Sequence, residues 1–220
     1  MGVISFSLKV FVAIFLVALI AIGIHSWLLS KSYVFNHKVI ASMTNKAIAT
    51  AKSEGNSTHR RIFELVADEL TATYHKRILP VQHREWIFIN CGGWMGAFYL
   101  LHASLTEYVL FFGTAIHTSG NSGRYWMNIS DTIIEGTFRQ WEEGSVKSVM
   151  HLPGTTVLHS WGEVTGVEWT PGTWMVEYGK GFVPSTLGFA LSDTIFGTLD
   201  CYTLYKTIRI YTIALYYGLF

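Results

Sequence analysis

Two carboxylates stand where a charge is costly. Glu177 lies in a short run of aromatic and aliphatic residues, and strand alternation places it on the same face as Met175, opposite Trp174 and Tyr178. Both faces are apolar, so the run reads as a buried strand. A carboxylate in such surroundings needs a proton, a cation or a hydrogen-bond partner, or its pKa rises until it is neutral. We therefore predict that Glu177 lies at the functional centre.

Asp131 is the second acid among aliphatic neighbours. In an extended strand it shares a face with Ile129 and Ile133. If Asp131 and Glu177 meet in one cavity, they can share a proton, because adjacent ionised carboxylates repel each other. The alternative is an Asx turn or a capping group beside Thr132, and the local pattern alone favours this alternative.

The histidines do not form a metal-binding pattern. His151 and His159 are separated by eight positions, and the sequence contains no His-x-His pair. We predict no metal and no cofactor, and we interpret His159 as a hydrogen-bonded structural histidine. The sequence also lacks the Gly-x-Ser-x-Gly elbow of serine hydrolases and a glycine-rich phosphate loop.

Composition narrows the class of protein. Half of the 220 residues are hydrophobic and only 14% are charged, against roughly a quarter in soluble domains. The net charge is +1, and no lysine-arginine cluster is longer than a pair such as Arg60-Arg61, so we do not expect nucleic-acid binding. Cys91 and Cys201 show no metal-ligand or redox spacing and predict no disulfide framework.

An uncharged apolar run, Val10–Ser30, precedes these residues. It is long enough to span a bilayer as a helix and longer than the apolar core of a signal peptide, so we expect a retained anchor. Lys9 precedes the run, whereas Lys31, Lys38 and Lys46 follow it, which weakly favours a cytosolic body.

The remaining elements must hold the acids in place. We expect two helices, at His37–Lys52 and Thr58–Lys76, and then a β-rich sandwich or barrel, because apolar runs alternate with dense glycine and proline turns. Beyond Pro184 the chain is apolar again. Helices there either lie flat on a bilayer or close the core of the β domain, and both can hold on opposite faces. The predicted segments are an anchor at 1–31, a helical connection at 32–84, a ligand-binding β domain at 85–183 and C-terminal helices at 184–220.

Several motifs in order resemble one family. The sequence between about Ser32 and about Arg209 is similar to the family of the sigma non-opioid intracellular receptors and the fungal sterol delta-8,delta-7 isomerases. The motifs that carry this resemblance are Asn90–Gly96, His102–Tyr108, Ser122–Trp126, Ile129–Ile133, Thr173–Gly179 and Pro184–Leu187.

The resemblance implies an α+β membrane protein with one N-terminal transmembrane helix, a cupin-like β-barrel, a membrane-associated C-terminal helix pair and a homotrimeric assembly. By the same resemblance Glu177 pairs with the amine of a ligand, Asp131 hydrogen-bonds that glutamate, and Tyr108 orients both acids. Glu107 takes a structural position at a hinge or interface. The further residues that it assigns to the ligand cavity are Trp94, Leu100, Phe112, Tyr125, His159, Trp169, Val183, Thr186, Leu187, Ala190 and Tyr211.

Departures from the family pattern favour a receptor over an enzyme. Asn121 stands where receptors and isomerases commonly have histidine, and Tyr125 stands where the isomerases have a second histidine, so the isomerase pattern is incomplete. Trp161 replaces a small or proline-like residue beside His159, whereas Trp126 and the context of Asp131 follow the receptor branch. We therefore expect a receptor and ligand-regulated chaperone of the endoplasmic reticulum membrane, extending to the nuclear envelope. The expected ligands are lipophilic amines, sterols or sphingolipid-like molecules, and the expected effects are on ion channels, other membrane proteins and lipid transport. The alternatives are a sterol isomerase that uses Asp131 and Glu177 in catalysis, and a purely structural membrane protein.

Overall fold

The computed structural model describes residues 2–219. The chain divides into two compact units, and the boundary between them in the sequence lies between Tyr33 and Val34. The first unit is dominated by α1 (Gly2–Ser30). Within it, Phe6–Ser30 has a mean hydropathy of 2.7 and is the one candidate membrane span in the described part of the chain. The predicted helix is present and begins earlier than the uncharged run, because Lys9 does not interrupt the helical backbone.

Two amphipathic helices open the second unit. α2 (His37–Ser53) is capped by the side chain of Asn36, and α3 (His59–Tyr74) by that of Thr58. Both predicted helices form. The second ends two residues earlier than predicted, because residue 75 has a positive φ of 43° and begins a short 3-10 turn, η1 (His75–Arg77). A second 3-10 turn, η2 (Val81–His83), leads into the strands.

Two antiparallel sheets make up the β domain. The larger has the strand order β1-β2-β3-β10-β5-β8, and the smaller has the order β4-β9-β6-β7. The strands are β1 (Trp86–Cys91), β2 (Trp94–Ala103), β3 (Glu107–Thr114), β4 (Thr118–Asn121), β5 (Met127–Glu135), β6 (Phe138–Glu142), β7 (Ser148–His151), β8 (Thr156–His159), β9 (Thr165–Trp169) and β10 (Thr173–Gly181).

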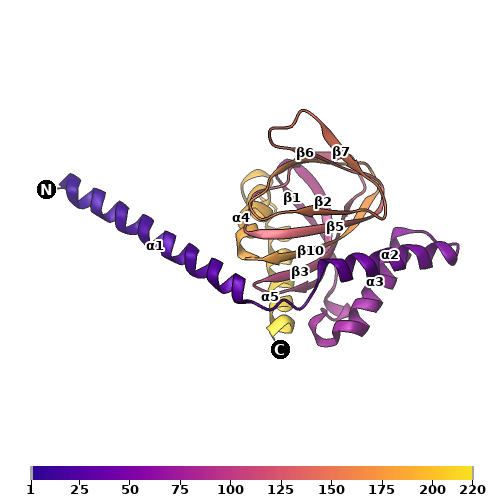
Figure 1. The fold of residues 1–220 in the computed structure, drawn as a ribbon. Coiled ribbons are helices and arrows are strands. Elements are labelled where there is room, and N and C mark those ends of the chain that lie inside the picture. Colours follow the sequence, from indigo (N-terminus) through magenta and orange to yellow (C-terminus); the bar gives the residue numbers. More distant parts are fainter. Residues whose placement is uncertain (1, 220) are drawn as a thin grey trace. The chain divides into compact units, whose positions relative to one another are not determined.

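The six-stranded sheet is buried on both faces along its central strands, β3 and β10. Its outer face packs against α2 and α3, where Val176 and Tyr178 of β10 join the same apolar cluster as Phe63 (Figure 1). Its inner face contributes Met175 to a second cluster, which also holds Trp169 of the smaller sheet. Alternation along β10 therefore divides its side chains as predicted, and Glu177 points to the space between the sheets.

The C-terminal segment closes one end of the β domain. It consists of α4 (Pro184–Ser192), a π-helical turn η3 (Asp193–Gly197) and α5 (Cys201–Leu219). Ile210 and Ala214 of α5 are buried in a cluster with residues of β1 and β2. This packing agrees with the expectation that the C-terminal helices close the core.

Candidate functional site: opposed acids in an apolar cavity

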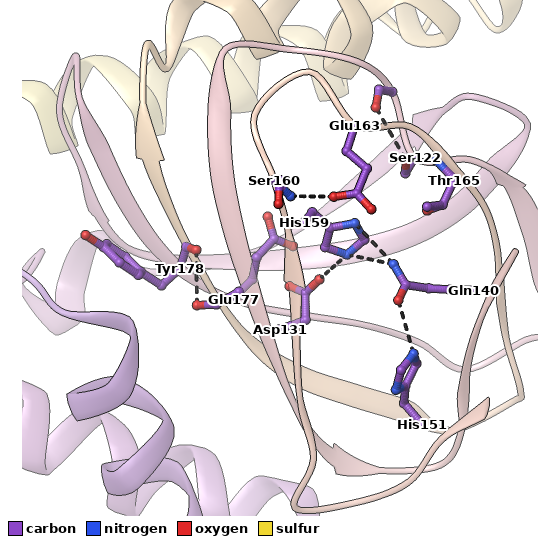
Figure 2. Close-up of polar contacts among 12 residues, drawn as sticks. Ser122, Asp131, Gln140, His151, His159, Ser160, Glu163, Thr165, Glu177 and Tyr178 are labelled. Atoms are coloured by element: carbon purple, nitrogen blue, oxygen red, sulfur yellow. Dashed lines mark hydrogen bonds and ion pairs between the residues drawn. The ribbon is translucent and has the colours of Figure 1, made fainter. Parts of the chain in front are cut away.

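Asp131 and Glu177 face each other across neighbouring strands. They are direct register partners in the antiparallel pair of β5 and β10, an arrangement that brings Cβ atoms to within roughly 4.5–5.5 Å. Figure 2 shows both side chains on the same side of the sheet, with the His159 ring beside Asp131 (Figure 2). Asp131 lies in the middle of β5, so its interpretation as an Asx turn or cap is wrong.

Each acid has one hydrogen bond from a different side chain. The Tyr108 hydroxyl donates to Glu177 Oε1 at 2.5 Å, and His159 Nε2 lies 3.0 Å from Asp131 Oδ2. Asp131 Oδ1 is buried and has no hydrogen-bond partner among the described residues. A buried acceptor left in this state costs about 1–3 kcal/mol. A proton held between the two carboxyl groups would satisfy it.

Burial controls the electrostatics of the pair. Burial raises the pKa of Glu177 to about 8, the charge of Asp131 acts in the same direction, and the hydrogen bond from Tyr108 opposes both. Glu177 keeps some accessible surface, but it lines the internal cavity, so water does not offset these effects. Burial lowers the pKa of His159, yet the hydrogen bond and charge of Asp131 outweigh it and raise the value. At neutral pH Glu177 is therefore mostly protonated.

The acids lie in a cavity of about 200 Å³. All fourteen residues assigned by resemblance to ligand binding line it, including Trp94 and Phe112 from the sheet and Thr186 from α4. The walls are largely apolar, so the acid pair is the main polar feature inside. The structure thus brings the predicted site residues together around one cavity.

Sequence reasoning missed several wall residues. Leu110 lies opposite Glu177 on β3, and Met175 and Phe189 also line the cavity. Strand alternation identifies Met175 once the inner face is known, whereas Leu110 needs the register between distant strands. Gly179 was also missed, although a Cβ there would come within 2.5 Å of Tyr108 Cζ. Only glycine leaves room for Tyr108 to lie across β10 and reach the acid.

Glu107 lies outside the cavity. It is 2% exposed, and its carboxylate accepts hydrogen bonds from the backbone N–H groups of Val34 and Phe35 and from the Tyr178 hydroxyl, at 2.8, 3.0 and 2.8 Å. It therefore ties the segment before α2 to the six-stranded sheet. Residues 2–219 contain no group of three or more His, Cys, Asp or Glu side chains that could hold a metal ion.

The fold and site define an α+β protein whose two-sheet domain encloses an apolar cavity with an opposed acid pair. The chain belongs to the family described as ERG2 and Sigma1 receptor like protein, which matches residues 10–220. Sigma non-opioid intracellular receptor 1 of Xenopus tropicalis is 53% identical over 206 residues, covering 92% of this chain and 90% of the relative. The C-8 sterol isomerase erg2 of Aspergillus fumigatus is more distant, with 35% identity over 206 residues, covering 92% of this chain and 82% of the relative.

Among solved structures, the cupin domain of Schizosaccharomyces pombe Cnp3 is similar with a TM-score of 0.36 and 6% identity, covering 41% of this chain and 68% of that domain. The sequence relatives support a receptor, and the long apolar α1 is consistent with a single-pass membrane protein.

Proposed function

We propose that the protein is a membrane receptor and ligand-regulated chaperone that binds lipophilic amines and sterol-like or sphingolipid-like molecules in the cavity between the sheets. The observation that carries this proposal is the opposed pair of Asp131 and Glu177 inside apolar walls. One proton on two acids leaves a single negative charge, which matches one ammonium group. The apolar parts of the ligand gain roughly 25 cal/mol for each Å² that they bury.

A drug-sized ligand has to enlarge the cavity, because ligand pockets usually measure roughly 300–1,000 Å³. α4 is the wall best suited to move. None of its residues is fully buried, although Thr186, Leu187 and Ala190 line the cavity. An outward shift of α4 therefore disrupts little core packing.

The family resemblance supplies the rest of the proposal. We place the receptor in the endoplasmic reticulum membrane and nuclear envelope as a single-pass homotrimer, where it modulates ion channels and other membrane proteins and takes part in lipid transport. Cell fractionation and cross-linking of the full chain test location and assembly directly.

Sterol isomerisation is the second candidate. The relative named C-8 sterol isomerase and the raised pKa of Glu177 both favour it. A protonated Glu177 would donate its proton to the ring alkene, and ionised Asp131 would stabilise the carbocation. Asp131 would then accept the proton that leaves the neighbouring carbon, and transfer of this proton to Glu177 would restore the starting pair. Incubation with a delta-8 sterol checks this candidate: product that disappears in Asp131→Asn and Glu177→Gln would establish it, and no product would exclude it.

Replacement of Glu177 by glutamine tests the receptor proposal. The variant keeps the size of the side chain but cannot become negative. We expect affinity for a lipophilic tertiary amine to fall at least about 30-fold in a membrane binding assay, since an uncompensated buried charge costs about 2–5 kcal/mol or more.

Glu168→Gln is the matched control. Glu168 is partly exposed on β9, outside the cavity, where it pairs with His117 and Arg139. Its replacement should leave amine affinity unchanged. Equal affinity of Glu177→Gln and the wild-type protein would refute the proposed role of the acid pair.

A further inference from the structure

A chain of hydrogen bonds leads away from the acid pair into the four-stranded sheet. His159 bonds Asp131, the amide nitrogen of Gln140 lies 3.2 Å from His159 Nδ1, and Gln140 Oε1 lies 3.1 Å from His151 Nε2 (Figure 2). Gln140 is on β6 and His151 on β7, and neither residue lines the cavity. Two residues outside the ligand space are thus connected to the acids.

The direction of each bond follows from chemistry. A carbonyl oxygen only accepts, so His151 Nε2 must carry a hydrogen, and an amide nitrogen only donates, so the His159 nitrogen that it faces must be bare. Nδ1 is the nearer nitrogen, at 3.2 Å against 3.4 Å for Nε2, and Nε2 carries the hydrogen toward Asp131. In this arrangement Gln140 holds His159 neutral.

A protonated His159 requires the opposite arrangement. Both of its nitrogens then donate, so the amide of Gln140 must turn by half a rotation and present its oxygen to His159. Its nitrogen then faces His151, whose Nε2 must be bare to accept. The single amide oxygen can face only one histidine, so His151 and His159 cannot both donate to Gln140.

Several charged or titratable groups face His159. They are Asp131 on β5, Glu177 on β10, His151 on β7 and Glu163 in the loop after β8. Glu163 is held there by the backbone N–H of Ser160, at 2.7 Å. Three surrounding acids favour a positive His159. Burial and the imidazole of His159 lower the pKa of His151, so His151 stays neutral when His159 takes up a proton.

The proton of the acid pair can thus be bound by either Glu177 or His159. When Glu177 holds the proton, its carboxyl group is neutral. When His159 holds the proton, both carboxylates are ionised. The net charge of the three groups is one negative unit in either state. Only the second state offers a full negative charge at Glu177 to a cationic ligand. The orientation of Gln140 therefore matters for ligand binding.

We propose that Gln140 and His151 are positioning residues that decide whether this proton rests on Glu177 or on His159, and that they set the pH range in which the cavity holds a cationic amine. This inference rests on the proposed function, because it concerns the proton of the same site.

The test is a pH profile of amine affinity for the full-length protein in membranes. The probe is N,N-dipropyl-4-phenylbutylamine, an alkylamine with a pKa of about 10 that stays protonated between about pH 5.5 and about pH 8.5. In the wild-type protein we expect affinity to fall as the pH drops, because Glu177 becomes protonated.

His151→Phe removes the donor that fixes Gln140 and keeps the stack on Phe138, where the ring centroids are 5.9 Å apart. The amide is then free to turn, His159 protonates more readily, and the midpoint of the profile should move about 0.5–1 unit to lower pH. Gln140→Glu offers only acceptors to His159 and should shift the midpoint further in the same direction. The control is His117→Phe, which removes an exposed histidine paired with Glu168 and should leave the profile unchanged.

Profiles of His151→Phe and Gln140→Glu that superimpose on the wild-type profile overturn the inference. The Glu177→Gln variant distinguishes failure of the positioning role from failure of the proposed function. If it abolishes amine binding while the profiles superimpose, only the positioning role fails, and if it binds the amine normally, the proposed function fails. Circular-dichroism spectra that match the spectrum of the wild-type protein show that each variant is folded.

The protonation state of His159 can also be measured directly in the wild-type chain. Nitrogen-15 NMR of labelled histidines, with the His159 signal identified by its loss in His159→Phe, should show neutral His159 with its hydrogen on Nε2 in the free protein. With saturating amine it should show His159 protonated on both nitrogens. A His159 that stays neutral in the amine complex contradicts the inference.

Discussion

Tyr108 and Glu177 form the hydrogen bond on which the charge of the site depends. Burial and Asp131 favour a protonated Glu177, and the hydroxyl of Tyr108 stabilises the ionised form. Burial and the charge of Glu177 raise the pKa of Tyr108 itself well above its ordinary value, so Tyr108 remains a donor throughout the physiological range.

Tyr108→Phe should therefore weaken amine binding. Loss of the donor raises the pKa of Glu177 still further, and a hydrogen bond to a charged group is worth about 1.5–3 kcal/mol. We expect affinity at neutral pH to fall about 10- to 100-fold, measured by equilibrium binding. Tyr99→Phe, on the helix-facing side of β2, is the control, and a loss of the same size in both variants would contradict this role.

Glu177 also makes the stability of the protein depend on pH. The pKa of Glu177 rises from its ordinary value of 4.5 to about 8 on folding, so its contribution is complete below pH 4.5 and is lost as the pH rises toward 8. The pKa of His159 is also raised from 6.5 on folding, so its contribution to stability is likewise lost as the pH rises above 6.5. Melting temperatures should therefore fall between about pH 5 and about pH 8. Glu177→Gln should flatten most of this slope, and an equally steep slope in the variant would contradict the assignment.

The sequence predicts one acid of the site well and the other poorly. Glu177 is conspicuous because its immediate neighbours are apolar, which is a local signal. Its contact with Asp131 depends on β10 lying between β3 and β5, and local patterns do not contain that order. The contact between Gln140 and His159 joins different sheets and had no signal in the sequence.

At the scale of elements, Glu107 connects the segment before α2 to β3 and β10. The three hydrogen bonds that it accepts come from Val34, Phe35 and Tyr178. They fix where the chain enters the second compact unit. The backbone N–H groups of Val34 and Phe35 donate to different carboxylate oxygens, so both oxygens at this position must accept.

Glu107→Gln should destabilise the protein by about 1–3 kcal/mol, because the amide nitrogen would face a backbone N–H that then lacks an acceptor. The measurement is thermal unfolding in detergent. Glu135→Gln changes an exposed glutamate that pairs with His59 and serves as the control. Equal melting temperatures for the two variants would show that the tie does not matter for stability.

The type of each element follows from local sequence more closely than its partners do. Turn glycines and alternating side chains predict the β-rich region, and the caps at Asn36 and Thr58 agree with the observed starts of α2 and α3. The division into sheets of six and four strands depends on pairings between distant segments. It was therefore not predictable from periodicity.

At the scale of the whole molecule, the C-terminal segment has two different faces. Ile210 and Ala214 are buried against the β domain, whereas Phe196 and Tyr202 are 84% and 71% exposed. Exposed aromatic residues on a helix are typical of a membrane interface. We therefore predict that this face contacts a bilayer.

A nitroxide label on Cys201 tests this contact. Cys201 is exposed at the start of α5, whereas Cys91 is buried, so labelling is selective. In bilayers the label should be accessible to oxygen and protected from a polar nickel chelate. Lys147→Cys, labelled in a Cys201→Ser background, should show the reverse pattern because Lys147 is exposed in the turn before β7. Full access of the chelate to Cys201 would contradict membrane contact.

The most direct test of the central claim is an experimental structure of the full-length protein with a bound lipophilic amine. We predict the ammonium nitrogen within about 2.7–3.2 Å of a Glu177 carboxylate oxygen. The apolar arms should extend between Trp94, Phe112 and α4, and Asp131 should keep its contact with His159. An amine bound outside the cavity, or one inside it whose nitrogen avoids Glu177, would contradict the account.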